Sequence, residues 1–217
     1  MSRYIISPHA QRTPEWRQDR LGKLTGSTVS AIFAGGEGRS RAALRAALML
    51  ERITGQAQML DFETEDVTWG NEQEPFSRMA TEAATGLDIA QTGFIYLPRI
   101  RAGVSVDGLI EDDGKLGVWE SKSPKSKNHY AYLLAKIIPP VYRPQVIHGM
   151  WVTGAQFAIF TSYDPRLPGN LGTFIVRIER NEAEIQAHER AVLQFLSEVD
   201  MEEKLMRLTA DAAIVIH

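Results

Sequence analysis

The feature that most constrains the fold is a pair of alternating apolar segments, residues 102–110 and 115–122, joined by a turn that contains Asp113-Gly114. An Asp-Gly dipeptide between two segments with a period of two is a strong local signal for a β-hairpin. Both segments carry side chains typical of a protein core: Val104, Val106, Val118 and Trp119. We therefore expect this hairpin at the centre of a sheet rather than at its periphery.

The register of this hairpin would bring two acids together. If Asp113 and Gly114 are the central turn residues, the numbers of opposed residues sum to 227, and Asp107 lies across from Glu120. Opposed like charges repel unless a cation lies between them. Lys122 is two residues beyond Glu120 and therefore on the same face. Two carboxylates and a lysine suit a hard cation such as Mg²⁺ and a lysine that orients or deprotonates water. A solvated hairpin face with an ordinary Glu–Lys pair is the alternative, and spacing alone leaves both open.

The rest of the chain predicts an α/β protein with a central mixed β-sheet flanked by helices. Further strands are expected over residues 93–97, 155–163 and 172–179. Helices are expected over residues 27–34, 39–53, from 69–71 to 85, 126–136, 144–153 and 181–208. No repeat or Gly/Ser linker interrupts the pattern, so we expect a single domain over residues 1–217, with a core of about 13–180 and a C-terminal helix of about 181–208.

Composition narrows the classes of function. The 217 residues contain no cysteine, which excludes disulfides, thiolate catalysis and cysteine-ligated metals. No apolar run reaches the length of a membrane helix, and we expect a soluble, cytoplasmic protein. The net charge is −3, but residues 1–52 hold nine Lys/Arg against four Asp/Glu, so a basic surface for a polyanion is compatible with it. The five histidines show no paired ligand spacing, and we interpret them as structural or surface residues.

Two further positions each allow a structural and a functional interpretation. Glu74 follows Asn71 by three residues, which is typical of a capping box, and nothing local places it beside Asp107. Ser27 is expected to be the N-cap of the 27–34 helix. A helix N-terminus with a hydroxyl and the nearby Arg20 would also make a phosphate site.

Taken in order along the chain, these motifs resemble the phage lambda exonuclease family. The matching set is Trp16-(x)3-Arg20-x-Gly22-(x)2-Thr25-x-Ser27, Trp69-Gly70-(x)3-Glu74, Asp107-Gly108, Glu120-Ser121-Lys122, Gln145, Met150-Trp151-Val152-Thr153, Tyr163-Asp164-Pro165-Arg166 and Ile178-Glu179-Arg180. The likeness spans roughly residues 13–205. Ser121 stands where the lambda enzyme has a leucine, and Val106 where a proline often precedes the aspartate, but no acid or lysine is lost.

The resemblance implies a restriction-endonuclease-like, PD-(D/E)XK core and a set of residue roles. Asp107, Glu120 and the backbone carbonyl of Ser121 would hold the metal, and Lys122 would activate the attacking water. Glu74 and Gln145 would complete the catalytic centre. Arg20 and Ser27 would bind the 5′-phosphate. Apart from the resemblance, Arg39, Arg41 and Arg45 follow a glycine-rich turn, which is compatible with a place along the DNA path, but a solvated helix face is at least as good an interpretation.

The resemblance also implies a substrate, a cofactor and partners. The expected activity is Mg²⁺-dependent 5′-to-3′ digestion of one strand of linear double-stranded DNA, which leaves 3′ single-stranded tails for phage-type recombination. One or two Mg²⁺ ions would serve, with Mn²⁺ as a substitute. The family forms a homotrimer ring and works with a single-strand annealing protein. A phage or prophage gene expressed in the bacterial cytoplasm is expected. The alternatives are an endonuclease or junction resolvase with the same core, and a catalytically silent DNA-end-binding protein.

Overall fold

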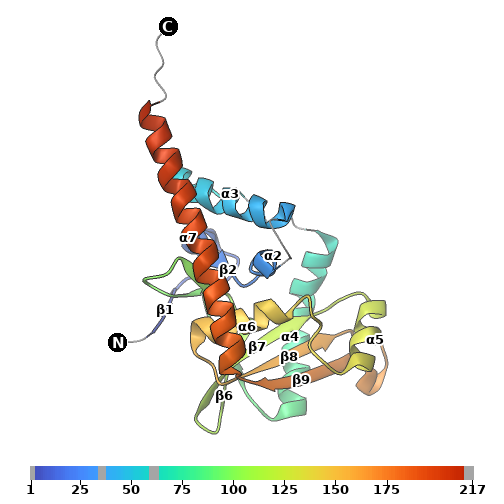
Figure 1. Cartoon of the computed structure of the whole chain (residues 1–217). Helices are drawn as coiled ribbons and strands as arrows, with labels where there is room; N and C mark the ends of the chain where they lie inside the picture. Colours follow the sequence, from blue (N-terminus) through green and yellow to red (C-terminus); the bar gives the residue numbers. More distant parts are fainter. Residues whose placement is uncertain (1–2, 34–37, 59–63, 213–217) are drawn as a thin grey trace.

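A computed structural model describes residues 3–33, 38–58 and 64–212, and its centre is a five-stranded mixed sheet (Figure 1). The strands are β3 (Ile89–Ala90), β6 (Gly108–Asp112), β7 (Lys115–Lys122), β8 (Phe157–Tyr163) and β9 (Thr173–Glu179), in the order β3-β6-β7-β8-β9. β7 and β8 are parallel, and the other neighbours are antiparallel. The expected α/β fold with a central mixed sheet is confirmed.

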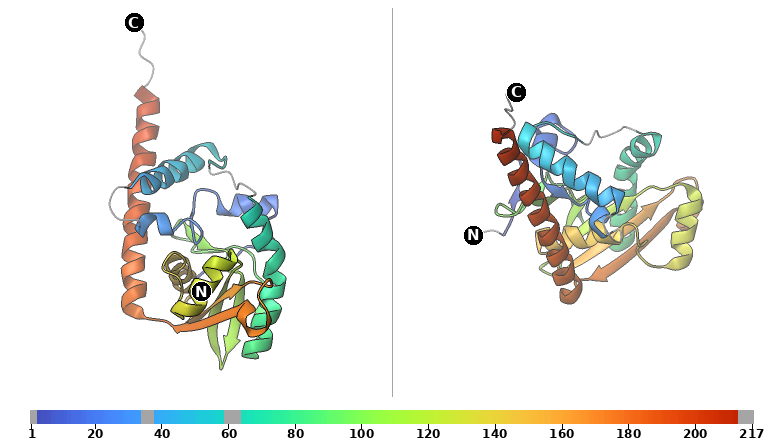
Figure 2. Two further views of the ribbon diagram at one scale, coloured as in Figure 1. Left: turned by 90° about the vertical axis from the view of Figure 1, so that its right-hand side faces the viewer. Right: turned by 45° about the horizontal axis from the view of Figure 1, so that its top comes forward.

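Helices cover both faces of this sheet. α4 (Glu65–Thr85) packs on one face, where Trp119, Phe157 and Ile159 form a buried cluster. α6 (Arg143–Thr153) packs on the other face beside α7 (Glu182–Ala212), and α5 (Ser126–Ala135) lies at β8 and β9. The left view of Figure 2 shows α4 and α7 on opposite sides of the sheet. In the described part of the chain no helix is long and apolar enough to cross a membrane.

A second, smaller sheet carries the N-terminal elements. Its strands, in the order β1-β4-β5-β2, are β1 (Ile5–Ile6), β4 (Ile95–Tyr96), β5 (Ala102–Val104) and β2 (Leu24–Thr25). Around it lie α1 (Pro14–Arg20), α2 (Ser30–Phe33) and α3 (Arg39–Thr54), and a 3-10 turn, η1 (Gly169–Gly172), precedes β9. The predicted strand over residues 93–97 is therefore short, and it belongs to this sheet rather than to the central one.

One predicted strand is two strands in different sheets. Residues 102–110 divide into β5 and β6, because side chains rather than a strand ladder bind the polar groups between them. Gln11 Nε2 donates to the carbonyl oxygen of Val106 at 2.8 Å, and Trp16 Nε1 donates to Ser105 Oγ at 3.0 Å. The alternation of apolar residues continues through the break because Val106 is buried as deeply as Val104.

Two predicted helix starts are wrong. α4 begins at Glu65, with Thr64 Oγ1 accepting from Val67 N at 3.3 Å, so Asn71 lies inside the helix and caps nothing. The capping-box interpretation of Glu74 fails with it. The first predicted helix is only Ser30–Phe33, preceded by turns in which the carbonyl oxygen of Thr25 accepts from the N–H groups that follow it. Ser27 is therefore not its N-cap.

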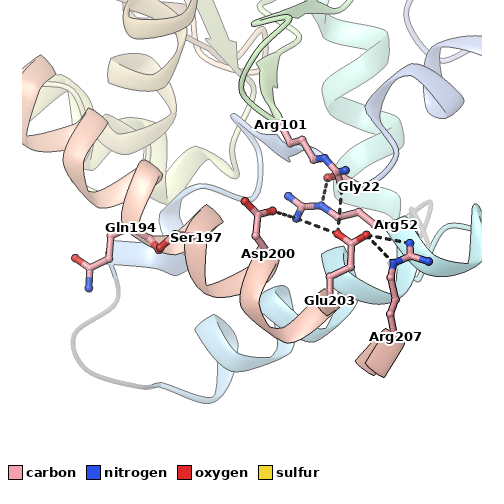
Figure 3. Close-up of polar contacts among 8 residues, drawn as sticks. All are labelled: Gly22, Arg52, Arg101, Gln194, Ser197, Asp200, Glu203 and Arg207. Carbon is pink, nitrogen blue, oxygen red and sulfur yellow. Dashed lines mark hydrogen bonds and ion pairs between the residues drawn. The ribbon is translucent and has the colours of Figure 1, made fainter. Parts of the chain in front are cut away.

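The long α7 is tied to the N-terminal elements by ion pairs (Figure 3). Arg52 Nη1 of α3 lies 2.7 Å from Asp200 Oδ1, and Arg52 Nε donates to the carbonyl oxygen of Gly22 at 2.9 Å. Glu203 of α7 accepts from Arg101 at 3.1 Å and from Arg207 at 2.9 Å. Gly22 has a φ of 66°, and a Cβ there would lie 2.7 Å from Arg52 Cγ, so this contact requires glycine.

Candidate active site

The hairpin has the register that the sequence predicts. Gly108 pairs with Trp119 and Asp112 with Lys115, so opposed numbers sum to 227. Asp107 directly precedes β6, and its Oδ2 accepts a hydrogen bond from the backbone N–H of Ser121 at 2.7 Å. Glu120 lies on β7 with only 3% of its surface exposed. The structure therefore brings the two predicted acids together at the end of a central strand pair.

Lys122 joins these acids from the same strand. Its ammonium nitrogen forms a short ion pair with Glu120 Oε1. The same nitrogen lies 5.5 Å from the centre of the ring of Tyr142, the residue that immediately precedes α6. A cation over an aromatic face is stabilised by the quadrupole of the ring. Lys122 is thus held on two sides, by a carboxylate and by an aromatic ring.

The electrostatics of the cluster are those of crowded carboxylates. Burial, opposed by Lys122 and assisted by the neighbouring Asp107, raises the pKa of Glu120 to about 7. Burial also raises the pKa of Asp107, against Lys122 and the Ser121 N–H. For Lys122, burial favours the neutral amine, but Glu120 and Asp107 outweigh it and raise its pKa. Lys122 is therefore an ammonium here, which favours orientation of a water over its deprotonation.

Glu74 reaches the same place from α4. Burial and the carboxylate of Asp107 raise the pKa of Glu74, and Arg12, whose guanidinium pairs with Glu74, opposes the shift. Both residues line a cleft of about 570 Å³ together with Asp107 and Lys122. The sequence could not place Glu74 here, because helix α4 is folded onto the sheet by contacts remote in sequence.

The donor set suits a divalent cation. Asp107 and Glu120 supply hard carboxylate oxygens, and burial raises the pKa of both, so a divalent cation would stabilise their ionised forms. The Ser121 side chain turns toward α4, where its Oγ lies 2.7 Å from Ser77 Oγ, so serine in place of leucine disturbs no acid. Within residues 3–33, 38–58 and 64–212, no group of three or more His, Cys, Asp or Glu is arranged to hold a metal. The side chains proposed as metal ligands are therefore the carboxylates of Asp107 and Glu120, and a ligand role for the Ser121 carbonyl oxygen stays a prediction.

Arg20 and Ser27 form a pair on the N-terminal elements. Arg20 Nη2 donates to Ser27 Oγ at 3.2 Å, and the guanidinium carbon lies 4.0 Å from the centre of the Trp16 ring. Trp16 Nε1 in turn donates to Ser105 Oγ, two residues before Asp107. The predicted phosphate pair is thus linked to the acids through one tryptophan, although Ser27 does not cap a helix.

Gln145 lies on α6 beside Gly26, which precedes Ser27. A Cβ at Gly26 would be 3.5 Å from Gln145 Cγ and 3.9 Å from His148 Cδ2. Gln145 is not among the residues that line the 570 Å³ cleft. Its predicted catalytic role therefore stays a prediction, and its position connects α6 with the 25–27 turn.

The arginines of α3 have different surroundings. Arg41 forms two hydrogen bonds with Glu198 of α7, at 2.6 and 2.8 Å, and Arg45 Nη1 lies 3.2 Å from the same carboxylate. Arg39 is exposed at the first position of α3. The ion pairs give Arg41 and Arg45 a role in joining α3 to α7, and DNA contact by any of the three stays a prediction.

Three residues that the sequence analysis gave no role also line the cleft. Arg166 lies over the Trp69 ring at 4.9 Å and is held by Asp164 Oδ1 at 2.6 Å. Arg12 lines this cleft and a second cavity of about 350 Å³. Trp69 and Arg166 belong to motifs shared with the lambda exonuclease family, and this could have indicated a role for them. Nothing in the sequence indicates a role for Arg12.

A mixed sheet with two acids and a lysine at a strand end is the core arrangement of the PD-(D/E)XK fold class. The chain belongs to the family of the YqaJ-like viral recombinase domain, which matches residues 15–156. It is thus a member of the phage-type alkaline exonuclease and recombinase group, and the resemblance to the lambda exonuclease family is confirmed.

Solved structures agree with this assignment. The alkaline exonuclease LHK-Exo of Laribacter hongkongensis has a TM-score of 0.83 and 33% identity, covering 92% of this chain and 99% of that one. Its complex with dAMP gives 0.84 at the same identity and coverage. A phage-related exonuclease of Haemophilus somnus 129PT shares the fold, with a TM-score of 0.63, 14% identity and coverage of 85% and 96%. ExoD of Escherichia coli K12 is 36% identical over 63 residues, which are 29% of this chain and 71% of ExoD.

Proposed function

We propose that this protein is a Mg²⁺-dependent 5′-to-3′ exonuclease that digests one strand of linear double-stranded DNA and leaves 3′ single-stranded tails. The observation that carries the proposal is the cluster of the buried Glu120 with the half-buried Asp107 and Lys122 at the cleft edge. Homology to the exonuclease LHK-Exo, at 33% sequence identity, supports a nuclease activity. Strand polarity rests on the Arg20–Ser27 pair.

In the proposed mechanism each residue has a defined task. Asp107, Glu120 and the Ser121 carbonyl would hold one Mg²⁺, with a second ion or Mn²⁺ as variants. When bound, the ion polarises the scissile phosphate and lowers the pKa of a water. Lys122, as an ammonium, orients that water for in-line attack and stabilises the negative charge of the phosphate. Glu74 lies beside Asp107 and accepts a hydrogen bond from Arg12 in the cleft.

Polarity would come from capture of the 5′-phosphate. Arg20 supplies a planar guanidinium and Ser27 a hydroxyl, both suited to phosphate oxygens. Each cleavage that releases a 5′-mononucleotide regenerates the terminal phosphate that this pair holds, so digestion continues in one direction. The crystallised complex of LHK-Exo with dAMP, which is a 5′-mononucleotide, is consistent with this product class.

The same proposal includes the assembly and the biological setting. A homotrimer ring around the DNA would keep the strand in the site, and a single-strand annealing protein would receive the 3′ tail. The setting is phage-type homologous recombination in the cytoplasm of a bacterial host, in agreement with the recombinase family of the domain.

The test uses 5′-phosphorylated linear duplex and closed circular duplex, each with Mg²⁺ and with EDTA. We expect Mg²⁺-dependent loss of one strand from its 5′ end in linear DNA only. Cutting of the circle would contradict the proposal and favour an endonuclease or junction resolvase. A mobility shift of linear DNA without degradation would favour a DNA-end-binding protein instead.

A further inference from the structure

Arg12 occupies a backbone position that favours glycine. Its φ is 73°, and the Thr13 N–H donates to the Ala10 carbonyl oxygen at 3.4 Å, so Arg12 is the third residue of a turn over residues 10–13. A positive φ at this position alone is typical of a type II turn, where glycine is preferred. In the described ranges, two other non-glycine residues have positive φ: Asp113, in the hairpin turn, and Lys136, the C-cap of α5. Those two conformations have ordinary local causes.

The Arg12 side chain is directed into the active-site cleft. Its Nη2 donates to Glu74 Oε2, and its charge lowers the pKa of Asp107 against the effect of burial. Arg12, Glu74 and Asp107 line both the 570 Å³ cleft and the adjoining 350 Å³ cavity. The Arg12–Glu74 pair therefore lies where the two cavities meet at Asp107.

The turn is held rigidly against the strand segment that carries Asp107. Gln11 Nε2, next to Arg12, donates to the carbonyl oxygens of Thr92 at 3.0 Å and Val106 at 2.8 Å. The Arg12 side chain is 48% exposed, and an ion pair with so exposed a partner contributes little to stability. The small contribution of the Arg12–Glu74 ion pair to stability therefore does not account for an arginine in a left-handed backbone conformation.

We propose that Arg12 contacts the substrate, with its guanidinium bound to a non-bridging oxygen of the phosphodiester that is cleaved at Asp107 and Glu120. The inference rests on the proposed nuclease function and adds a residue to it. A guanidinium has five donors in a planar fork, and the pair with Glu74 uses Nη2. Arg12 and Lys122 line the same cleft, so two cations would flank the phosphate.

The experiment compares Arg12→Gly, Arg12→Lys and the control Arg190→Ala. Arg190 is exposed on α7, and α7 lies on the opposite side of the sheet from α4 (Figure 2). Because glycine suits a φ of 73°, we expect Arg12→Gly to melt no lower than the wild type. Its kcat on 5′-phosphorylated linear duplex should fall about tenfold to a hundredfold. Arg12→Lys keeps the charge but loses the planar guanidinium, so its kcat should lie between those of Arg12→Gly and the wild type. The kcat of Arg190→Ala should match that of the wild type.

Binding of duplex in EDTA separates contact with DNA from an effect through Glu74. If Arg12 contacts a phosphate, the slope of log K against log salt should become shallower by about 0.9 in Arg12→Gly, and by the same amount in a Glu74→Gln background. Disappearance of the effect in the Glu74→Gln background would overturn the proposal, because Arg12 would then act through Glu74. If the wild type cleaves the duplex and Arg12→Gly has the same kcat, this proposal alone would be overturned. Absence of wild-type cleavage would overturn the proposed function as well.

Discussion

The acids at the end of β7 and the Arg20–Ser27 pair differ in how they are built. Glu120 is buried in the central sheet, and backbone ladders on both sides fix its strand. Ser27 lies in an exposed turn after the two-residue strand β2, and Arg20 is the last residue of the short helix α1. One tryptophan, Trp16, joins the two regions through Ser105.

This difference assigns the two tasks of the proposed enzyme to two kinds of structure. Chemistry requires groups held in fixed positions at low solvent exposure, which a central strand provides. Capture of a terminal phosphate requires accessible donors, which an exposed turn provides. A change in the first region should therefore abolish turnover, whereas a change in the second should alter which DNA ends are used.

The largest effect is expected at Asp107. Asp107→Asn preserves the shape of the side chain but removes a charge from the proposed metal site, so cleavage should fall at least about a thousandfold. Asp113→Asn is the matched control, because Asp113 is exposed at the tip of the same hairpin and asparagine tolerates its φ of 52°. Turnover of labelled linear duplex measures both. Near-normal turnover in Asp107→Asn would remove the mechanism.

A smaller and selective effect is expected at Arg20. Arg20→Ala should reduce cleavage of 5′-phosphorylated ends about tenfold to a hundredfold and change 5′-hydroxyl ends little, because its partner on the substrate is the terminal phosphate. Arg17→Ala removes the same charge from the exposed side of α1 and serves as the control. Initial rates on the two kinds of end provide the comparison. Equal losses on both ends would place the phosphate pocket elsewhere.

The smallest effect concerns stability and comes from two buried histidines, one of which lies beside Gly26 in the turn that carries Ser27. His148 Nδ1 lies 3.0 Å from His188 Nε2, and His148 Nε2 lies 3.1 Å from the Gly103 carbonyl oxygen. Burial lowers the pKa of His148 to about 3, with His188 adding to the shift, and burial lowers the pKa of His188 to about 4 against Glu184. Both histidines are therefore neutral in the folded protein.

Below pH 6.5 the unfolded chain takes up protons on these histidines that the folded chain does not, so stability falls as the pH decreases toward 4. The expected slope is on the order of 1 kcal/mol per pH unit for each histidine. Urea unfolding between pH 7.5 and 5 measures it. His188→Gln should show a shallower decline than the wild type, and an unchanged decline would contradict this account.

The sequence predicted what depends on local geometry. The Asp113-Gly114 turn determined the register, and the observed pairs have the predicted sum of 227, with Asp107 immediately before the first of them. Strand β7 has its predicted bounds, and α3 and α6 begin or end within one residue of theirs. The histidines were interpreted as structural or surface residues: His129, His148 and His188 are buried and hydrogen-bonded, His9 is exposed, and His217 lies outside the described residues.

One error was local: Asn71 resembled an N-cap because Glu74 follows it by three residues, yet Thr64 caps a helix that begins at Glu65. The other errors came from contacts between segments distant in sequence. The break at Ser105 is stabilised by Gln11 and Trp16, about ninety residues away, which no local pattern reveals. The same holds for Arg41, whose partner Glu198 belongs to the last helix.

The central claim, that the opposed carboxylates of Asp107 and Glu120 hold a divalent cation, is tested most directly by calorimetric titration of Mn²⁺ into the protein without DNA. The account predicts saturable binding in the wild type and in Asp113→Asn, and its loss in Asp107→Asn. Proton release should accompany binding near pH 7, because burial raises the pKa of Glu120 to about 7 and the ion requires the carboxylate. Binding of equal strength in Asp107→Asn would contradict the claim.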